Sequence, residues 1–178
     1  MVASDEALRQ TAARARVPLW LPYPLPADWL ITGLRWAGSD RTGPVATVLA
    51  CSGPHPLPTQ IWDGAGAVRA ADLLLVAEEP GVGLGAHLAG LPTVDPAGAI
   101  GQGAPAVKLR ADGHDVPLWW IGTDDTAVFV GEAAGVWLWV LVWPADAAAV
   151  LMEKFRLQDY REPEHDLVLG FGALSPRV

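Results

Sequence analysis

The segment Val136–Trp143 limits the possible folds more than any other part of the chain, because all eight of its residues are large and apolar. Side chains alternate between the two faces of a β-strand, so as a strand this segment is apolar on both faces. The apolar run from Ala133 ends at Pro144 after eleven residues, whereas a membrane-spanning helix needs about 20. The strand must therefore be covered on both sides, which predicts a sheet that curls into a barrel-like form or is sandwiched.

Two turn dipeptides extend this strand into a β-meander. Asp112-Gly113 supplies the positive φ values that a tight hairpin turn requires, and Ala134-Gly135 marks a second hairpin. The predicted meander consists of the strands Ala106–Ala111, Asp115–Ile121, Thr126–Gly131 and Val136–Trp143.

The remaining pattern adds four strands and three helices. The further strands are Trp29–Ala37, Pro44–Cys51, Asp72–Ala77 and Phe155–Tyr160, and the helices are Ser4–Arg16, Leu84–Leu91 and Ala145–Glu153. Eight short strands without a repeated βαβ alternation predict an α+β fold that is mostly antiparallel β. We expect a single curled sheet or barrel-like β-meander with an N-terminal helix and one or two short helices.

The length of 178 residues suits a single domain. We expect four parts: a peripheral helix over residues 1–16, a proline-rich strap over 17–28, a β-rich core over 29–160 and a tail over 161–178. Four prolines keep the strap extended, and Trp20 and Tyr23 are among its residues that are too apolar for a solvated linker. A strap packed on the domain surface is favoured over a ligand for a proline-binding module, because the prolines lack the PxxP spacing.

Charge and cysteine content exclude several classes of partner. The chain has 12 basic and 20 acidic residues, a net charge of −8, and lysine only at Lys108 and Lys154. Nonspecific nucleic-acid binding needs clustered cations, so we expect neither nucleic acid nor an anionic membrane as a partner. Cys51 is the single cysteine, and residues 1–20 contain no apolar segment of the signal-peptide type. We therefore expect a cytoplasmic protein without a metal or another cofactor.

The most distinctive local string is the glycine-rich stretch from Ala77 to His87, which follows a predicted strand. Its glycines loosely match a dinucleotide-binding loop, but two carboxylates and a proline precede them, and their charge would repel a phosphate. A metal site would need a third ligand that the sequence does not supply. The favoured role is a loop that folds tightly against the sheet. If this loop binds a ligand or partner, the candidate residues are Glu78, Glu79, Gly81, Gly83, Gly85 and His87.

A nucleophile is a second possibility, at Cys51-Ser-Gly-Pro-His55. Attack by a thiolate needs a base within hydrogen-bond reach and an oxyanion hole, and a spacing of four residues across Gly-Pro establishes neither. Cysteine is among the most frequently buried residue types, so a core cysteine is favoured. We predict no catalytic residue.

The nine tryptophans are unusual for a chain of this length. Several fall on neighbouring predicted strands, and an aromatic face could contact an apolar ligand or a partner. Large aromatic side chains also dominate ordinary cores, so we expect most of them to be buried. Trp119 and Trp137 are the candidate binding residues among them.

Several strings carry a resemblance to a known family: Trp20-Leu-Pro-Tyr-Pro-Leu-Pro26, Ala50-Cys-Ser-Gly-Pro54, Leu75-Val-Ala-Glu-Glu79, Gly81-Val-Gly-Leu-Gly-Ala86 and Gly172-Ala-Leu-Ser-Pro-Arg177. From about Val17 onward the chain resembles a family of uncharacterised actinobacterial proteins. Members often carry a Cys/His zinc-ribbon-like segment before this domain, which this chain with its single cysteine lacks. The family has no established activity, so the resemblance implies no catalytic residue and no metal role.

Two functions of different classes remain open. The first is a non-enzymatic binding or interaction domain that contacts an unknown protein partner or small molecule through the loop 78–87 and exposed aromatic residues. The alternative is a small-molecule-binding enzyme that uses Glu79, His87 or Cys51 in a pocket beside that loop. The enzyme requires these side chains to converge within hydrogen-bond reach of one substrate.

Overall fold

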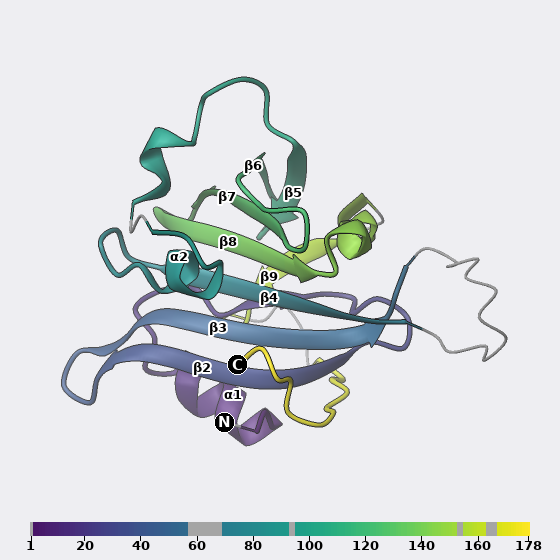
Figure 1. Ribbon diagram of the computed structural model, residues 1–178. Helices are drawn as coiled ribbons and strands as arrows, with labels where there is room; N and C mark the ends of the chain where they lie inside the picture. Colours follow the sequence, from purple (N-terminus) through teal and green to yellow (C-terminus); the bar gives the residue numbers. More distant parts are fainter. Residues whose placement is uncertain (1, 57–68, 93–94, 153–154, 163–166) are drawn as a thin grey trace, which may run out of the picture.

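One nine-stranded sheet forms the body of the computed structural model, which describes residues 2–56, 69–92, 95–152, 155–162 and 167–178. The sheet curls into a half-barrel (Figure 1). Its strands are β1 (Trp20–Pro22), β2 (Leu30–Ser39), β3 (Gly43–Pro54), β4 (Ala70–Glu78), β5 (Val107–Ala111), β6 (His114–Trp120), β7 (Ala127–Ala133), β8 (Val136–Trp143) and β9 (Arg156–Asp159). The helices are α1 (Asp5–Ala12), α2 (Leu84–Leu88) and the 3₁₀ helices η1 (Pro96–Gly98) and η2 (Ala145–Met152).

The strand order is β1-β9-β5-β6-β7-β8-β4-β3-β2. Neighbours are antiparallel except β5 and β9, which are parallel, so the sheet is mixed but mostly antiparallel. The predicted meander β5–β8 is confirmed. Its two predicted hairpins have positive φ at both turn residues, 50° and 79° at Asp112-Gly113 and 53° and 76° at Ala134-Gly135.

The proline-rich stretch contributes a ninth strand, which the sequence pattern did not predict. Trp20–Pro22 pairs with β9 at one end of the sheet, and Trp20 and Leu21 are buried in the core. Proline is tolerated there because an end strand has neighbours on one side only. Three residues are too short a run for periodicity to reveal a strand, and only the pairing with β9 defines it.

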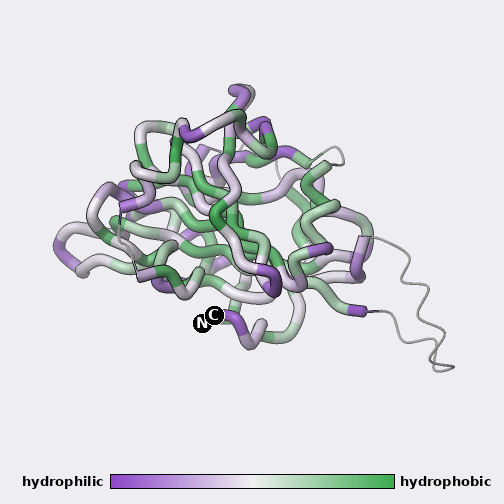
Figure 2. Tube along the Cα trace, turned by 45° about the horizontal axis from the view of Figure 1, so that its top comes forward, coloured by the Kyte–Doolittle hydropathy of each residue, from purple (hydrophilic) through white to green (hydrophobic). Residues whose placement is uncertain are grey.

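Both faces of the central strands are buried, as the apolar segment Val136–Trp143 predicted. Leu138, Val140 and Val142 lie in the larger core inside the curl, while Trp139 and Leu141 lie in a second core on the outer face. Apolar residues accordingly run through the middle of the strands, and hydrophilic residues gather at the turns (Figure 2). The outer core is covered by α2 and by residues that follow it.

The helix α1 begins as predicted and ends early. The Ser4 side chain caps it by accepting a hydrogen bond from the Ala7 amide at 3.2 Å. The helix was expected to reach Arg16 but ends at Ala12. The Arg16 amide donates instead to the Pro44 carbonyl at 2.9 Å, so this backbone already pairs with β3. No described helix is long and apolar enough to cross a membrane.

Segment 167–178 lies along β2, the strand at the other end of the sheet. The amide of Gly172 donates to the Ile31 carbonyl at 2.9 Å, and the amide of Ser175 donates to the Thr32 carbonyl at 2.8 Å. The Val178 side chain is buried in the outer core. These contacts cover part of an edge that would otherwise be open to pairing with another chain.

Candidate binding groove

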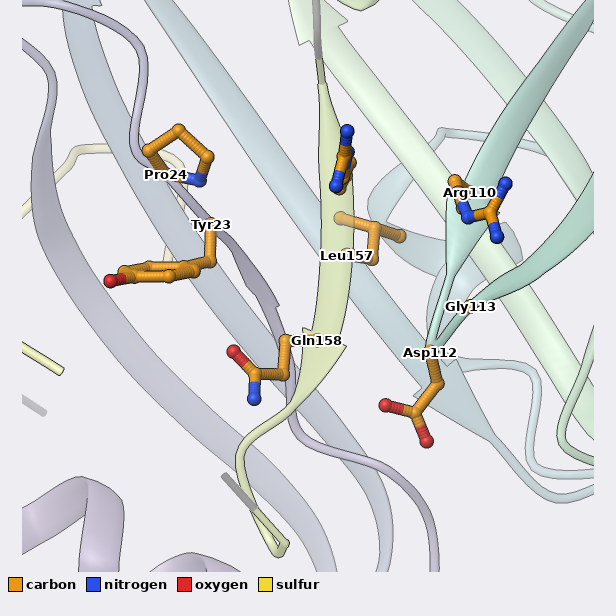
Figure 3. A pocket seen from close by; sticks show the side chains of 8 residues that line it. Tyr23, Pro24, Arg110, Asp112, Gly113, Leu157 and Gln158 are labelled. Atoms are coloured by element: carbon orange, nitrogen blue, oxygen red, sulfur yellow. The ribbon is translucent and has the colours of Figure 1, made fainter. Parts of the chain in front are cut away.

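A groove lies over β9, between β1 on one side and β5 on the other (Figure 3). Its volume is about 470 Å³, within the range of small-molecule sites. The residues that line it are Tyr23, Pro24, Arg110, Asp112, Gly113, Arg156, Leu157 and Gln158. Three segments far apart in the chain therefore meet at this site.

Two arginines in the groove are direct neighbours. Arg110 of β5 is in register with Arg156 of β9, so the two guanidinium groups leave the same face of the sheet. Both residues are exposed, and within the described part of the chain neither forms an ion pair or a side-chain hydrogen bond. Like charges that face each other across strands are destabilising, so this pair lacks the compensation that an anion would supply.

Most of the other arginines form ion pairs with described residues, unlike Arg110 and Arg156. Six of the ten arginines form ion pairs with carboxylates: Arg9, Arg14, Arg16, Arg69, Arg161 and Arg177. Arg110 also faces Asp115 across the β5–β6 pair, but no nitrogen–oxygen distance between them is 4.0 Å or less. Arg110 and Arg156 thus share this patch with Asp112 and Asp115, but neither arginine forms an ion pair with a described carboxylate.

The rest of the lining supplies polar and apolar contacts. The Gln158 side chain makes no hydrogen bond to the described residues, and its Nε2 atom is buried without an acceptor. Tyr23 exposes 39% of its surface at the β1 side, and Leu157 lies between the two sides on β9. The groove thus combines cations, an amide without a partner among the described residues and an aromatic ring.

Glu78, which the sequence placed among the candidate binding residues, is completely buried under α2. Its Oε2 accepts hydrogen bonds from the amides of Leu84 at 2.6 Å and Gly85 at 3.2 Å. Its Oε1 has no hydrogen-bond partner in the described ranges, and the indole of Trp139 lies beside the carboxylate outside hydrogen-bonding geometry. Burial raises the pKa of Glu78, while the two amides and the indole act in the opposite direction. Glu78 therefore ties the loop to the sheet.

The other candidates of the glycine-rich loop do not converge. Glu79 forms an ion pair with Arg16 at 3.1 Å. Gly81 and His87 are exposed, and the His87 imidazole makes no hydrogen bond or ion pair with any described residue. Gly83 begins α2 with φ of 77°, a left-handed conformation that favours glycine. This geometry matches the favoured sequence interpretation, a loop folded tightly against the sheet.

Gly85 packs directly against the buried Trp139 ring, so a Cβ at this position would overlap the indole. We expect Gly85→Ala to lower the free energy of unfolding by about 1–3 kcal/mol, because overpacking outweighs the better helix propensity of alanine. Urea denaturation monitored by circular dichroism measures this difference. Gly98→Ala is the matched control, since a Cβ added there would meet no described atom within 4 Å, and it should be nearly neutral. Equal effects at the two sites would contradict the proposed packing.

The tryptophans divide between core and surface. Trp119 is half-buried and its Nε1 donates to the Gly103 carbonyl at 3.2 Å, and Trp137 is half-buried against the outer core. Of the eight described tryptophans, Trp120 alone is largely exposed, at 46%, with its edge against Phe129. Trp62 lies outside the described residues.

The residues of the enzyme alternative are far from one another. Cys51 is completely buried, and burial raises the pKa of its thiol. His55 follows on the same extended strand, about 13 Å away at roughly 3.3 Å per residue, and its Nε2 pairs with Asp146 Oδ1 at 3.0 Å. Leu73 is opposite Cys51, so Glu78 and Glu79 lie about 16 Å or more along β4. His87, the remaining residue of this alternative, lies on α2 over the outer core, whereas Cys51 lies in the larger core on the other face of the sheet. Glu79, His87 and Cys51 therefore do not converge on one substrate.

Comparison with known proteins gives a family but no activity. Among the described residues, no three His, Cys, Asp or Glu side chains gather at a site that could hold a metal. The model of a family of unknown function, DUF6758, matches residues 1–178. The chain belongs to this family. No curated protein and no solved structure matches it. The resemblance to an uncharacterised family is thereby confirmed.

The groove of this DUF6758 chain was not predicted from the sequence. Arg110 and Arg156 were expected on strands, but the parallel pairing of β5 with β9 that aligns them has no local signal. Tyr23 was assigned to a strap and Asp112 to a turn. A search for arginines on predicted strands would have found both cations, though not their proximity.

Proposed function

We propose that this DUF6758 chain is a non-catalytic binding domain that holds a small anion in the groove over β9. The observation that supports this function best is the register pair Arg110–Arg156, which has no carboxylate partner among the described residues. A guanidinium binds a phosphate or carboxylate through two parallel hydrogen bonds, and each arginine of the pair offers such a fork. An anion between them would remove the repulsion between the two guanidinium groups.

A small anion suits this groove better than a polyanion does. Nonspecific nucleic-acid binding needs clusters of Lys and Arg, whereas this groove has two arginines and a carboxylate, in a chain of net charge −8. The volume of about 470 Å³ also fits a molecule of monosaccharide size. We further propose a cytoplasmic location, since a lone buried cysteine is compatible with a reducing compartment.

A protein partner is the second candidate, at the loop 78–87. Gly81 and His87 are exposed in this loop, and Trp120 exposes 46% of its surface on β6. Exposed tryptophan is enriched in the energetic centres of interfaces. Glu78 and Gly85 do not belong to this contact surface, because both are buried.

Binding of a simple anion tests the proposed function. We expect inorganic phosphate or citrate, added at low ionic strength to ¹⁵N-labelled protein, to shift amide signals of β1, β5 and β9. Arg110→Gln or Arg156→Gln should weaken binding by about tenfold or more, because a hydrogen bond to a charged group contributes about 1.5–3 kcal/mol.

Arg35→Gln is the matched control for this titration. Arg35 is exposed and forms no ion pair with a described residue, like the groove arginines, but lies on β2. The Arg35→Gln substitution should leave the affinity for phosphate or citrate unchanged. Signal shifts spread over the whole surface, or equal affinities in all three variants, would exclude the groove as an anion site.

A further inference from the structure

The groove has a second polar end besides the arginine pair. A ligand that contacts both ends is recognised more specifically than a simple anion that contacts the arginines alone. We infer that the anion held in the groove also carries hydroxyl groups, as in a sugar phosphate or a hydroxy acid. This inference rests on the proposed function, because Arg110 and Arg156 hold the charged group, and it adds what the other end of the groove recognises.

The register places the second end. Asp112 follows Arg110 by two residues, and Gln158 follows Arg156 by two residues. Because β5 and β9 run parallel, these two steps lead in the same direction, and the Asp112 amide continues the ladder by donating to the Leu157 carbonyl at 2.9 Å. Arg156 and Gln158 are two apart on β9, so they share a face and lie about 6.6 Å apart, whereas Asp112 is the turn residue that follows the end of β5. Asp112 and Gln158 lie at one end of the groove and Arg110 at the other (Figure 3).

The chemistry of this second end matches a hydroxyl group. The Asp112 carboxylate only accepts hydrogen bonds and would repel a second anionic group. The Gln158 amide makes no hydrogen bond within the described part of the chain, and its Nε2 donor lacks an acceptor there. A hydroxyl donates to the Asp112 carboxylate and accepts from the Gln158 amide once that side chain, whose Nε2 is buried, turns toward the groove. An ammonium group only donates, so it has no use for this donor.

The space between the two ends suits a short carbon skeleton. The Tyr23 ring flanks the groove on the β1 side, while the Leu157 side chain points into the core. The separation of about 6.6 Å between Arg156 and Gln158 along β9 is spanned by a chain or ring of a few carbons. An aromatic side chain beside polar groups can contact the C–H face of such a skeleton while the polar groups reach its hydroxyls.

Isothermal titration calorimetry with a matched set of probes tests this inference. The probes are inorganic phosphate, glucose 6-phosphate, acetate, gluconate and glutamate. We expect glucose 6-phosphate to bind about tenfold more tightly than inorganic phosphate, or gluconate about tenfold more tightly than acetate, and the pair that shows the gain identifies the charged group as a phosphate ester or a carboxylate. A tenfold gain corresponds to about 1.4 kcal/mol, one net hydrogen bond.

Two substitutions at Asp112 separate a hydroxyl from an ammonium group. Asp112 has φ of 50°, which asparagine and glycine both tolerate, so the hairpin is kept in either variant. Asp112→Asn retains an accepting oxygen and should stay within about threefold of the wild-type affinity for the hydroxylated anion, while Asp112→Gly and Gln158→Leu should remove the tenfold gain.

The outcomes distinguish this inference from the proposed function. If simple and hydroxylated anions bind the groove equally well, the hydroxyl inference is wrong and the anion site stands. If glutamate binds most tightly and Asp112→Asn abolishes that binding, the second end recognises an ammonium group and the inference is also wrong. If no probe binds and the Arg110→Gln variant behaves like the wild type, the proposed function itself fails.

Discussion

Replacing Trp139 with alanine should lower the free energy of unfolding by about 3–5 kcal/mol, as expected when a large aromatic side chain is removed from a core. Trp139 is completely buried in the outer core, between β8 and α2, and Gly85 packs on its ring. The surrounding strands cannot move together to fill a space of this size, because they are hydrogen-bonded on both sides. Urea denaturation followed by circular dichroism measures the change.

Trp120→Ala is the matched control for Trp139→Ala. Trp120 exposes 46% of its surface and contacts Phe129 edge to face, with ring centroids 5.2 Å apart. Such a contact contributes about 0.5–1.5 kcal/mol, so this variant should lose about 1 kcal/mol. Similar losses in the two variants would mean that the outer core does not enclose Trp139 as described.

Replacing Glu78 with alanine should be the second most damaging change, with a loss of about 2–3 kcal/mol. Its carboxylate is the acceptor for the amides of Leu84 and Gly85, and both would be left without a partner beneath α2. A buried donor without an acceptor costs about 1–3 kcal/mol, partly offset here because a buried charge is also removed. Urea denaturation measures the loss, and hydrogen exchange at Leu84 and Gly85 should become faster.

Glu78→Gln is the control, and it also tests the titration of this group. Glutamine retains an accepting oxygen for both amides, so the loss at neutral pH should stay below about 1 kcal/mol. Burial raises the folded-state pKa of Glu78 above its ordinary value of 4.5, so the folded protein binds this proton more tightly than the unfolded chain. The stability that Glu78 contributes is therefore greatest below the unfolded pKa, falls as the pH rises toward the folded pKa, and is constant above it.

The difference in the free energy of unfolding between wild type and Glu78→Gln should show this dependence on pH. Plotted from pH 4 upward, the wild-type free energy of unfolding should decline relative to the variant by at most about 1.36 kcal/mol per pH unit. A difference that is flat across this range, or that rises with pH, would show that the carboxylate is not held in a desolvated site.

Local sequence signals determined most of the sheet. Alternating or continuous runs of apolar residues indicated the strands, and Asp112-Gly113 and Ala134-Gly135 indicated the hairpins, because turn conformation depends on a few neighbouring residues. The apolar character of Val136–Trp143 on both faces also predicted that the sheet is covered on both sides. Family membership added no site residue, since the family has no known function.

Long-range contacts determined what the sequence pattern left open. The pairing of Trp20–Pro22 with β9 and the parallel alignment of Arg110 with Arg156 join residues far apart in the chain, and no local preference encodes such pairs. Glu78 was predicted at the end of a strand, but whether its carboxylate faces solvent or the underside of a helix depends on how the following loop returns. The sequence by itself thus determined which segments are strands and which must be buried, whereas the tertiary structure alone decided which charged side chains are neighbours, because proximity across a sheet arises only when its strands assemble.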